Sequence, residues 1–167
     1  MKPKQRLEEH GLLVVGHVWI SRQTEQRRLE FNIVFDVVPE AECWPYCVYA
    51  FRGEDGEVVR IGKAHCLRCR VSQWRRDITG ALNRKSDEPD PKGGASRDEA
   101  ADWKRFLHTG AKCEFLALCT VSETFAKSGL RGSELRKSVL RKREQGLINL
   151  FWPRFSRELR GRHRPEL

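Results

Sequence analysis

The stretch from Cys47 to Trp74, CVYAFRGEDGEVVRIGKAHCLRCRVSQW, combines a tyrosine with several cations. A planar guanidinium such as that of Arg70 can bind two oxygens of one phosphate, and Lys63 offers a compact positive charge. Tyr49 supplies a phenol, whose deprotonated form a nearby cation would favour. These residue types are typical of a phosphate-binding site, and the alternative is that the cations only keep the surface solvated.

A further candidate is Glu144, in the segment GSELRKSVLRKREQGLINLF near the C-terminal end. Its spacing from Leu140, Leu147 and Ile148 places it on the apolar face of a helix. A carboxylate on such a face costs free energy unless it meets a cation, a set of hydrogen bonds or a metal ion. Two interpretations therefore stay open, an ion pair with a nearby arginine and a metal site.

The elements that must position Tyr49 are predicted by YCVYAF, GEDG and EVVRIG, which read as strand, turn and strand. If the turn has two central residues, the numbers of two residues that face each other across the hairpin add up to an odd number. Four residues then share one face of the hairpin: Tyr49, Phe51, Arg60 and Gly62. We therefore expect Tyr49 and Arg60 to be neighbours.

The segment HCLRCRVSQWRRDI is predicted to form a helix. Its apolar residues, Leu67, Val71, Trp74 and Ile78, follow one another at spacings of four, three and four, which fits one helical face. Arg70 lies one turn from Leu67 and from Trp74, on the flank of that face. The spacing places this arginine at an edge of the core.

The remaining elements are less regular. The alternation in LEFNIVFDV predicts a strand from Leu29 to Val37, and CEFLALCT is a candidate buried strand. GLLVVGHVWI fits the end of a helix or a second strand, so residues 1–45 are interpreted as an N-terminal extension. Prolines, glycines and charges predict an inserted loop at about residues 80–102. The last helix is expected to be capped by Ser133 and to end before Pro153.

Composition bounds the class of protein. The 167 residues suit one main domain, and 33% of them are charged against 39% hydrophobic, without a membrane-spanning apolar run. The start, MKPKQRLEEHG, lacks the apolar core of a secretory signal, so we expect a cytoplasmic protein whose six cysteines are reduced. The net charge of +9 favours a polyanionic partner, nucleic acid before a membrane surface.

Several motifs in this order resemble the GIY-YIG nuclease family over about residues 46 to 157. CVY stands where the first triplet is expected, and RIG follows it after Ala50 to Val59. GKAHCLRCR resembles the run from lysine to arginine that opens the first helix of the family. EQGLINLFWPRFS resembles the family's ending, a glutamate followed by Leu-Ile and then by proline and an aromatic residue. Separated motifs at the right spacing make this resemblance specific.

The resemblance implies an α/β (α+β) domain with a small antiparallel sheet flanked by helices, which cuts phosphodiester bonds with one divalent metal, Mg²⁺ or Mn²⁺. By position, Tyr49 matches the tyrosine of the first triplet and is the expected general base. Lys63 matches the lysine after the second triplet. Arg70 matches the arginine of the first helix, which would bind the phosphate. Glu144 matches the metal-binding glutamate. Arg60, at the start of the second triplet, completes the expected catalytic set.

Three positions depart from the family pattern. Arg60 replaces a tyrosine, Cys47 replaces a glycine, and Ser156 stands where an asparagine is common. Some relatives have a basic residue at the position of Arg60, where it would act on the base or the phosphate. The alternative is a non-catalytic nucleic-acid-binding module, in which Arg60 marks a lost site.

A different hypothesis rests on the cysteines. CWPYC and CLRC supply four thiols, from Cys43, Cys47, Cys66 and Cys69, which could hold a structural zinc ion. Against this, Cys47 falls within a predicted strand, and Cys66 and Cys69 within a predicted helix. The tight turns that usually present zinc ligands are therefore missing from the predicted elements.

The sequence thus predicts a metal-dependent DNA endonuclease, of restriction type because the chain is compact and shows no separate DNA-binding module. Repair or mobile-element nucleases stay open as alternatives. Target recognition would reside in the N-terminal extension of residues 1–45 and in the inserted loop of the nuclease domain of residues 46–157. The basic tail of residues 158–167 could grip the DNA backbone. Cutting both strands with one centre per chain would suggest a homodimer.

Overall fold

A computed structural model describes residues 6–25, 28–83, 103, 112–120 and 132–153. Five antiparallel strands form one sheet in the order β2-β1-β5-β3-β4, so that β2 and β4 are its edges. The strands are β1 (Leu13–Glu25), β2 (Arg28–Val37), β3 (Pro45–Arg52), β4 (Val58–Cys66) and β5 (Cys113–Cys119). The helices are the 3-10 turn η1 (Leu7–His10), α1 (Pro39–Glu42), α2 (Leu67–Asn83) and α5 (Gly132–Phe151).

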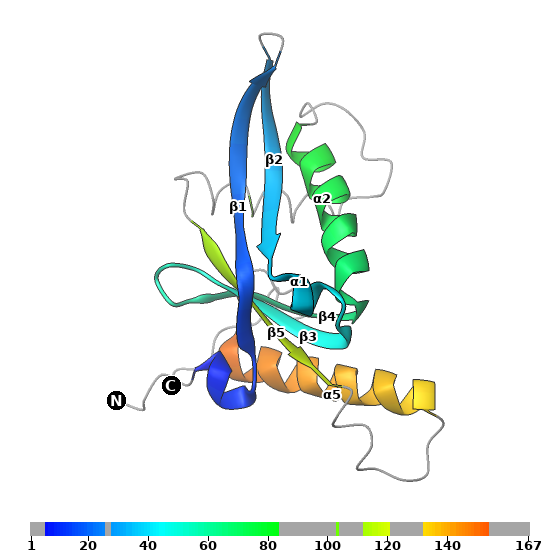
Figure 1. Cartoon of the computed structure of the whole chain (residues 1–167). Helices are drawn as coiled ribbons and strands as arrows, with labels where there is room; N and C mark the ends of the chain where they lie inside the picture. Colours follow the sequence, from blue (N-terminus) through cyan, green and yellow to red (C-terminus); the bar gives the residue numbers. More distant parts are fainter. Residues whose placement is uncertain (1–5, 26–27, 84–102, 104–111, 121–131, 154–167) are drawn as a thin grey trace.

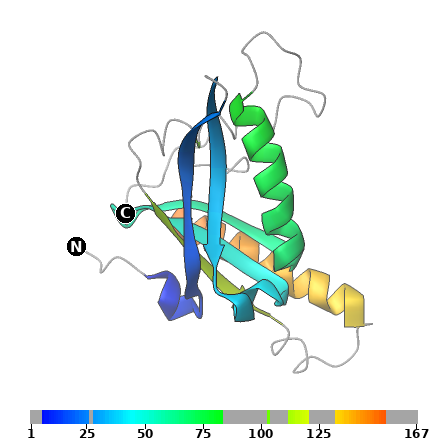
Figure 2. The same cartoon turned by 45° about the horizontal axis from the view of Figure 1, so that its top comes forward.

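The sheet is strongly curled, and the long hairpin of β1 and β2 crosses the part formed by β3, β4 and β5 (Figures 1 and 2). Two apolar clusters lie on its two faces, because alternate residues of β3 point to opposite sides. Tyr49 and Phe51 pack with α2, whereas Val48 and Ala50 pack with α5. The sheet therefore separates the two long helices.

The hairpin of β3 and β4 has the register that the sequence predicts, since Tyr49 pairs with Gly62 and Phe51 with Arg60. The predicted two-residue turn is wrong. Gly53 N donates to Glu57 O and Gly56 N donates to Gly53 O, which closes a three-residue loop with Gly56 in the left-handed region. The loop is one residue longer than predicted, and a register shift between Phe51 and Arg52 compensates for this residue.

Helix α2 follows β4 directly and buries the predicted apolar stripe of Leu67, Val71, Trp74 and Ile78. It continues through Gly80 to Asn83, so the loop predicted from residue 80 onward is wrong at its start. Leu82 extends the buried stripe by one turn, which explains why the helix persists past the glycine. Residues 84–102 of that predicted loop lie outside the described part of the chain.

Helix α2 also covers the free edge of β2. Arg75 donates to Phe35 O at 2.7 Å, and Thr79 Oγ1 accepts from Ile33 N at 3.2 Å. Asn83 Oδ1 accepts from Phe31 N at 2.7 Å, and its Nδ2 donates to Phe31 O at 2.6 Å. These helix residues are four positions apart, and they meet every second residue of β2. Side chains of α2 thereby pair four backbone groups of this edge strand, on Phe31, Ile33 and Phe35.

The N-terminal segment belongs to the same sheet. The predicted strand at residues 29–37 is confirmed as β2, and the ambiguous segment GLLVVGHVWI lies largely in β1. β1 pairs with β2 on one side and with β5 on the other. Arg52 of β3 further ties η1 to the sheet through a two-fold contact with Glu8, at 2.7 and 2.9 Å. The sheet therefore crosses the domain boundary predicted at residue 45.

Helix α5 ends before Pro153, as the sequence predicts. Trp152 adopts a left-handed conformation, with φ of 48°, and its N–H donates to Ile148 O. The start differs from the prediction, because Gly132 is already helical and Ser133 is therefore not the capping residue. Among the helices that the structure describes, none has the length and apolar character needed to cross a membrane.

Candidate active site at the edge strand β4

Lys63 and Glu144 form an ion pair on the face of the sheet that α5 covers. Lys63 lies on β4 opposite Val48, and Glu144 lies on α5 among the buried Leu140, Leu147 and Ile148. The Glu144 side chain is 14% exposed and that of Lys63 is 39% exposed. The sequence anticipated an arginine as one partner of this carboxylate, and the structure supplies a lysine from the candidate site itself.

Tyr49 lies on the opposite face, where its ring covers Gly62 on the neighbouring strand. A Cβ atom at Gly62 would come within 2.8 Å of Tyr49 Cε2 and still nearer to its hydroxyl. Only a residue without a side chain fits there, which explains why the second triplet ends in glycine. Tyr49 itself is 2% exposed, so the expected general base is buried.

Trp74 of α2 contacts both Tyr49 and Arg60. Its ring meets that of Tyr49 edge to face, with centroids 5.1 Å apart, and the guanidinium carbon of Arg60 lies 5.5 Å from the Trp74 centroid. The predicted closeness of Tyr49 and Arg60 on one face is confirmed by the register. An arginine over an indole gains a cation–π attraction, so position 60 also contributes to packing.

Arg70 lies in the second turn of α2 and is half-buried, at the edge of the core as the sequence predicts. Its Nη1 donates to Gln73 Oε1 at 3.0 Å. The five predicted site residues thus form two pairs and a separate arginine. The pairs lie on opposite faces of the edge strand, because Arg60 and Lys63 are an odd number of positions apart on β4.

Glu144 is the residue that could hold a divalent metal ion. Among the described residues no group of three or more histidine, cysteine, aspartate or glutamate side chains could bind a metal ion. A single carboxylate fits Mg²⁺, which usually keeps several waters and binds through one or two carboxylates plus substrate phosphates. The ammonium of Lys63 shows that a positive charge is already accommodated at this carboxylate.

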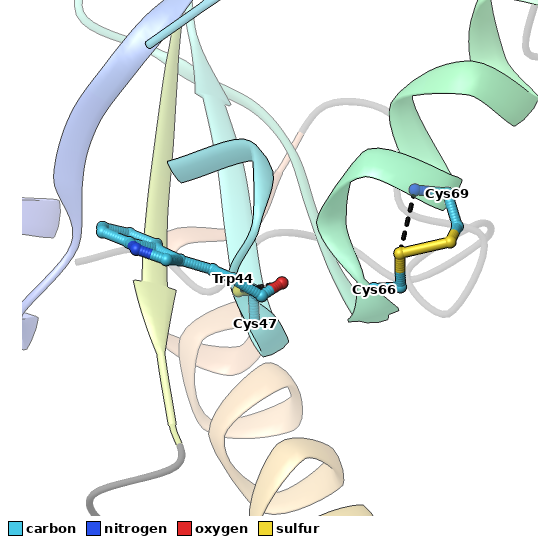
Figure 3. Close-up of a disulfide and its surroundings, with 4 residues drawn as sticks. All are labelled: Trp44, Cys47, Cys66 and Cys69. Carbon is cyan, nitrogen blue, oxygen red and sulfur yellow. Dashed lines mark hydrogen bonds between the residues drawn. A yellow bond between two sulfur atoms is a disulfide. The ribbon is translucent and has the colours of Figure 1, made fainter. Parts of the chain in front are cut away.

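The cysteines do not fit a zinc site. Cys66 and Cys69 form a disulfide where β4 passes into α2, and Figure 3 shows it apart from Cys47 and Trp44. The expectation that all six cysteines are reduced is therefore wrong for this pair. Burial, together with Cys119 nearby, raises the pKa of Cys47 to about 12, so this thiol stays protonated at neutral pH. With Cys66 and Cys69 oxidised, only Cys43 and Cys47 remain of the four proposed ligands, and two thiols do not complete a tetrahedral zinc site.

Tyr46 and Arg136 also lie near the candidate site, although they belong to none of the motifs that resemble the nuclease family. The rings of Tyr46 and His65 stack with centroids 5.5 Å apart, and the guanidinium carbon of Arg136 lies 5.2 Å from the Tyr46 centroid. Two features of the sequence could have indicated these residues. Position 46 pairs with position 65 in the predicted register, and Arg136 precedes Glu144 by two steps of four residues on one helical face. Ser156 and residues 158–167 lie outside the described residues.

Comparison with known proteins supports the fold. No protein-family model matches the chain, and no curated protein matches its sequence. One similar solved structure is that of a mutant of bacteriophage T4 EndoII, with a TM-score of 0.51 and 18% sequence identity. The alignment covers 89% of this chain and 94% of that chain. The chain therefore has the predicted mixed α/β, GIY-YIG-like fold, and at this identity the similarity shows the fold alone.

Proposed function

We propose that this protein is a metal-dependent DNA endonuclease, of restriction type, that hydrolyses phosphodiester bonds. The observation that carries the proposal is the carboxylate of Glu144, held among apolar residues on α5 and paired with Lys63 on the edge strand. The fold is similar to that of EndoII, whose name denotes an endonuclease. A net charge of +9 favours a polyanionic substrate.

In this proposal Glu144 holds the metal ion, and Lys63 balances the carboxylate when no metal is bound. A bound Mg²⁺ would supply Lewis-acid stabilisation of the phosphoryl oxygens and of the leaving group. Arg70 binds non-bridging oxygens of the scissile phosphate after its side chain leaves Gln73. Tyr49 is the proposed general base, but it is buried on the opposite face of the sheet from Glu144, so it takes the proton from the attacking water only after a movement that brings its hydroxyl to the metal side. Arg60 lies on the same face as Tyr49 and would attract the negative phenol oxygen.

A second candidate function is a non-catalytic module that binds nucleic acid. The observation in its favour is that Tyr49 is buried and that Arg60 packs on Trp74, so both have a structural use. The two functions differ in the effect of Tyr49→Phe, which removes the hydroxyl and keeps the ring. The nuclease proposal predicts a slower single-turnover rate with unchanged DNA binding, and an unchanged rate would remove Tyr49 from the mechanism.

The test of the proposal is DNA cleavage by the purified protein. Supercoiled plasmid and bacteriophage DNA would be incubated with Mg²⁺ or with EDTA. Discrete fragments that form only with Mg²⁺ would support a site-specific restriction-type enzyme. Nicking without a pattern would favour a repair or mobile-element role, and DNA binding without any cleavage would overturn the nuclease proposal in favour of the binding module.

A further inference from the structure

Tyr46 contacts both His65 and Arg136 on the face of the sheet that α5 covers, and these three residues are here called the Tyr46 stack. The Tyr46 and His65 rings are nearly parallel, with an interplanar angle of 30°, and Arg136 lies over the Tyr46 ring. His65 is exposed, whereas Tyr46 and Arg136 are half-buried. Two nitrogen-bearing side chains are thus held by one aromatic ring at the border between core and solvent.

The backbone holds Tyr46 in an unfavourable conformation. Its φ of 51° lies in the left-handed region, which a bulky aromatic residue rarely adopts. Thr120, which is fully buried, fixes this geometry, because its N–H and its Oγ1 both donate to Tyr46 O, at 3.0 and 2.6 Å. Strained residues that the surrounding structure fixes in this way cluster at functional sites.

The stack lies next to the proposed metal-binding carboxylate. His65 is two residues beyond Lys63 on the same face of β4, which corresponds to about 7 Å along a strand. Arg136 lies on the same side of α5 as Glu144, two helical turns before it. A duplex advances about 3.4 Å per nucleotide along its axis. Eight residues of helix correspond to about 12 Å, so the stack lies about 7 to 12 Å along the two elements from the ion pair. This separation matches a phosphate about two to four nucleotides from the scissile one.

We propose that the Tyr46 stack is a second phosphate-binding position, which takes a phosphodiester group of the DNA strand about two to four nucleotides from the cut. The Arg136 guanidinium and the His65 imidazole are both donors to phosphate oxygens. Tyr46 orients them, and so it is a positioning residue. This inference rests on the proposed function, because it takes the DNA strand as its ligand.

The test is DNA binding measured by fluorescence anisotropy in EDTA, so that the strand stays intact. Arg136→Gln is compared with Arg141→Gln, which removes the same charge from an exposed position of the same helix. We expect Arg136→Gln to weaken binding about tenfold and to lower the salt slope by about one, and Arg141→Gln to change either far less. His65→Gln, at an exposed position, is a second variant that leaves the core intact.

A scan of the DNA identifies the phosphate. One methylphosphonate at a time is placed along each strand of a duplex, which removes a single negative charge. At one position the substitution should weaken binding by the wild type and by Arg141→Gln, but not by Arg136→Gln or His65→Gln. Equal responses of all four proteins at every position would overturn the inference.

The same proteins assayed in Mg²⁺ separate this inference from the proposed function. If the wild type cuts DNA but Arg136→Gln and Arg141→Gln bind alike, the inference is overturned and the nuclease proposal stands. If one phosphate shows the expected coupling and the wild type does not cut, the phosphate contact is supported and the nuclease proposal fails. A wild type that does not bind DNA overturns both.

Discussion

Glu144 shows how a carboxylate is kept on an otherwise apolar helical face. Leu140, Leu147 and Ile148 surround it, and the ammonium of Lys63 compensates a charge that those neighbours cannot solvate. Since Lys63 is 39% exposed, water screens part of the attraction, and the lysine can leave without being drawn from the core. A metal ion could therefore replace the Lys63 ammonium at the Glu144 carboxylate.

Removal of Lys63 should destabilise the protein. Lys63→Met leaves Glu144 without its cation, and we expect a loss of about 1 kcal/mol in the free energy of unfolding, measured with guanidinium chloride. Lys137→Met, at an exposed position of α5, is the control and should change little. In the background of Glu144→Gln the effect of Lys63→Met should shrink. If Lys63→Met lowers the free energy of unfolding equally in the wild type and in Glu144→Gln, Lys63 and Glu144 do not stabilise each other.

Gly62 must remain small because the Tyr49 ring covers it. Gly62→Ala should lower the free energy of unfolding by about 2 kcal/mol, as expected for overpacking of a dense core. Gly80→Ala is a matched control, because a Cβ at Gly80 on α2 meets nothing within 4 Å and alanine favours a helix. Thermal unfolding of both variants checks this prediction, which fails if Gly62→Ala is as stable as the wild type.

The contact between Glu8 and Arg52 predicts a dependence of stability on pH. The hydrogen bond from Arg52 lowers the pKa of Glu8 below its ordinary value of 4.5. A lowered carboxylate pKa stabilises the folded state above pH 4.5, and this contribution is lost as the pH falls through the lowered value. The free energy of unfolding, measured between pH 7 and pH 3, should therefore fall less steeply with decreasing pH for Glu8→Gln than for the wild type. Glu40→Gln, an exposed carboxylate, should leave the slope unchanged, and a Glu8→Gln slope equal to the wild-type slope would contradict the prediction.

At the scale of the elements, the side chains that α2 sends to the edge of β2 couple the helix to the N-terminal hairpin. Asn83 acts like a short peptide, since its amide both accepts from and donates to the backbone of Phe31. Thr79 and Arg75 repeat such contacts one and two turns earlier. An otherwise unpaired edge is thereby covered, which limits strand addition by other molecules.

Loss of one of these contacts should be measurable. Asn83→Ala removes both hydrogen bonds to Phe31, and we expect the free energy of unfolding to fall by about 1–2 kcal/mol. The amides of β2 should also exchange faster with deuterium than in the wild type. Ser72→Ala, at an exposed position of α2, is the control. Unchanged exchange in β2 would show that α2 does not protect this edge.

Local patterns predicted most elements but not their ends. The apolar stripe of α2 and the alternation of β2 are set by burial of one face, and both are found as predicted. The end of α2 differs because burial of Leu82 outweighs the poor helical propensity of Gly80. The hairpin register was correct although the turn was wrong, because the longer loop and the bulge next to Arg52 offset each other.

At the scale of the whole molecule, long-range pairing could not be predicted. Strand β1 lies between β2 and β5, and the partner β5 is far away in the sequence. The residues of the candidate site were predicted, but not their distribution over two faces of β4. The odd spacing of Arg60 and Lys63 on β4 already places them on opposite faces, but no local spacing encodes that α2 covers one of these faces and α5 the other.

The most direct test of the account is the single-turnover cleavage rate of Glu144→Gln on a DNA duplex that the wild type cuts, at equal DNA occupancy. Because the metal ion is proposed to bind this carboxylate, we predict a loss of about a thousandfold, with DNA affinity changed little. Glu134→Gln, at an exposed position of the same helix, should cut at the wild-type rate. A Glu144→Gln protein that cuts as fast as the wild type would contradict the assignment of this site.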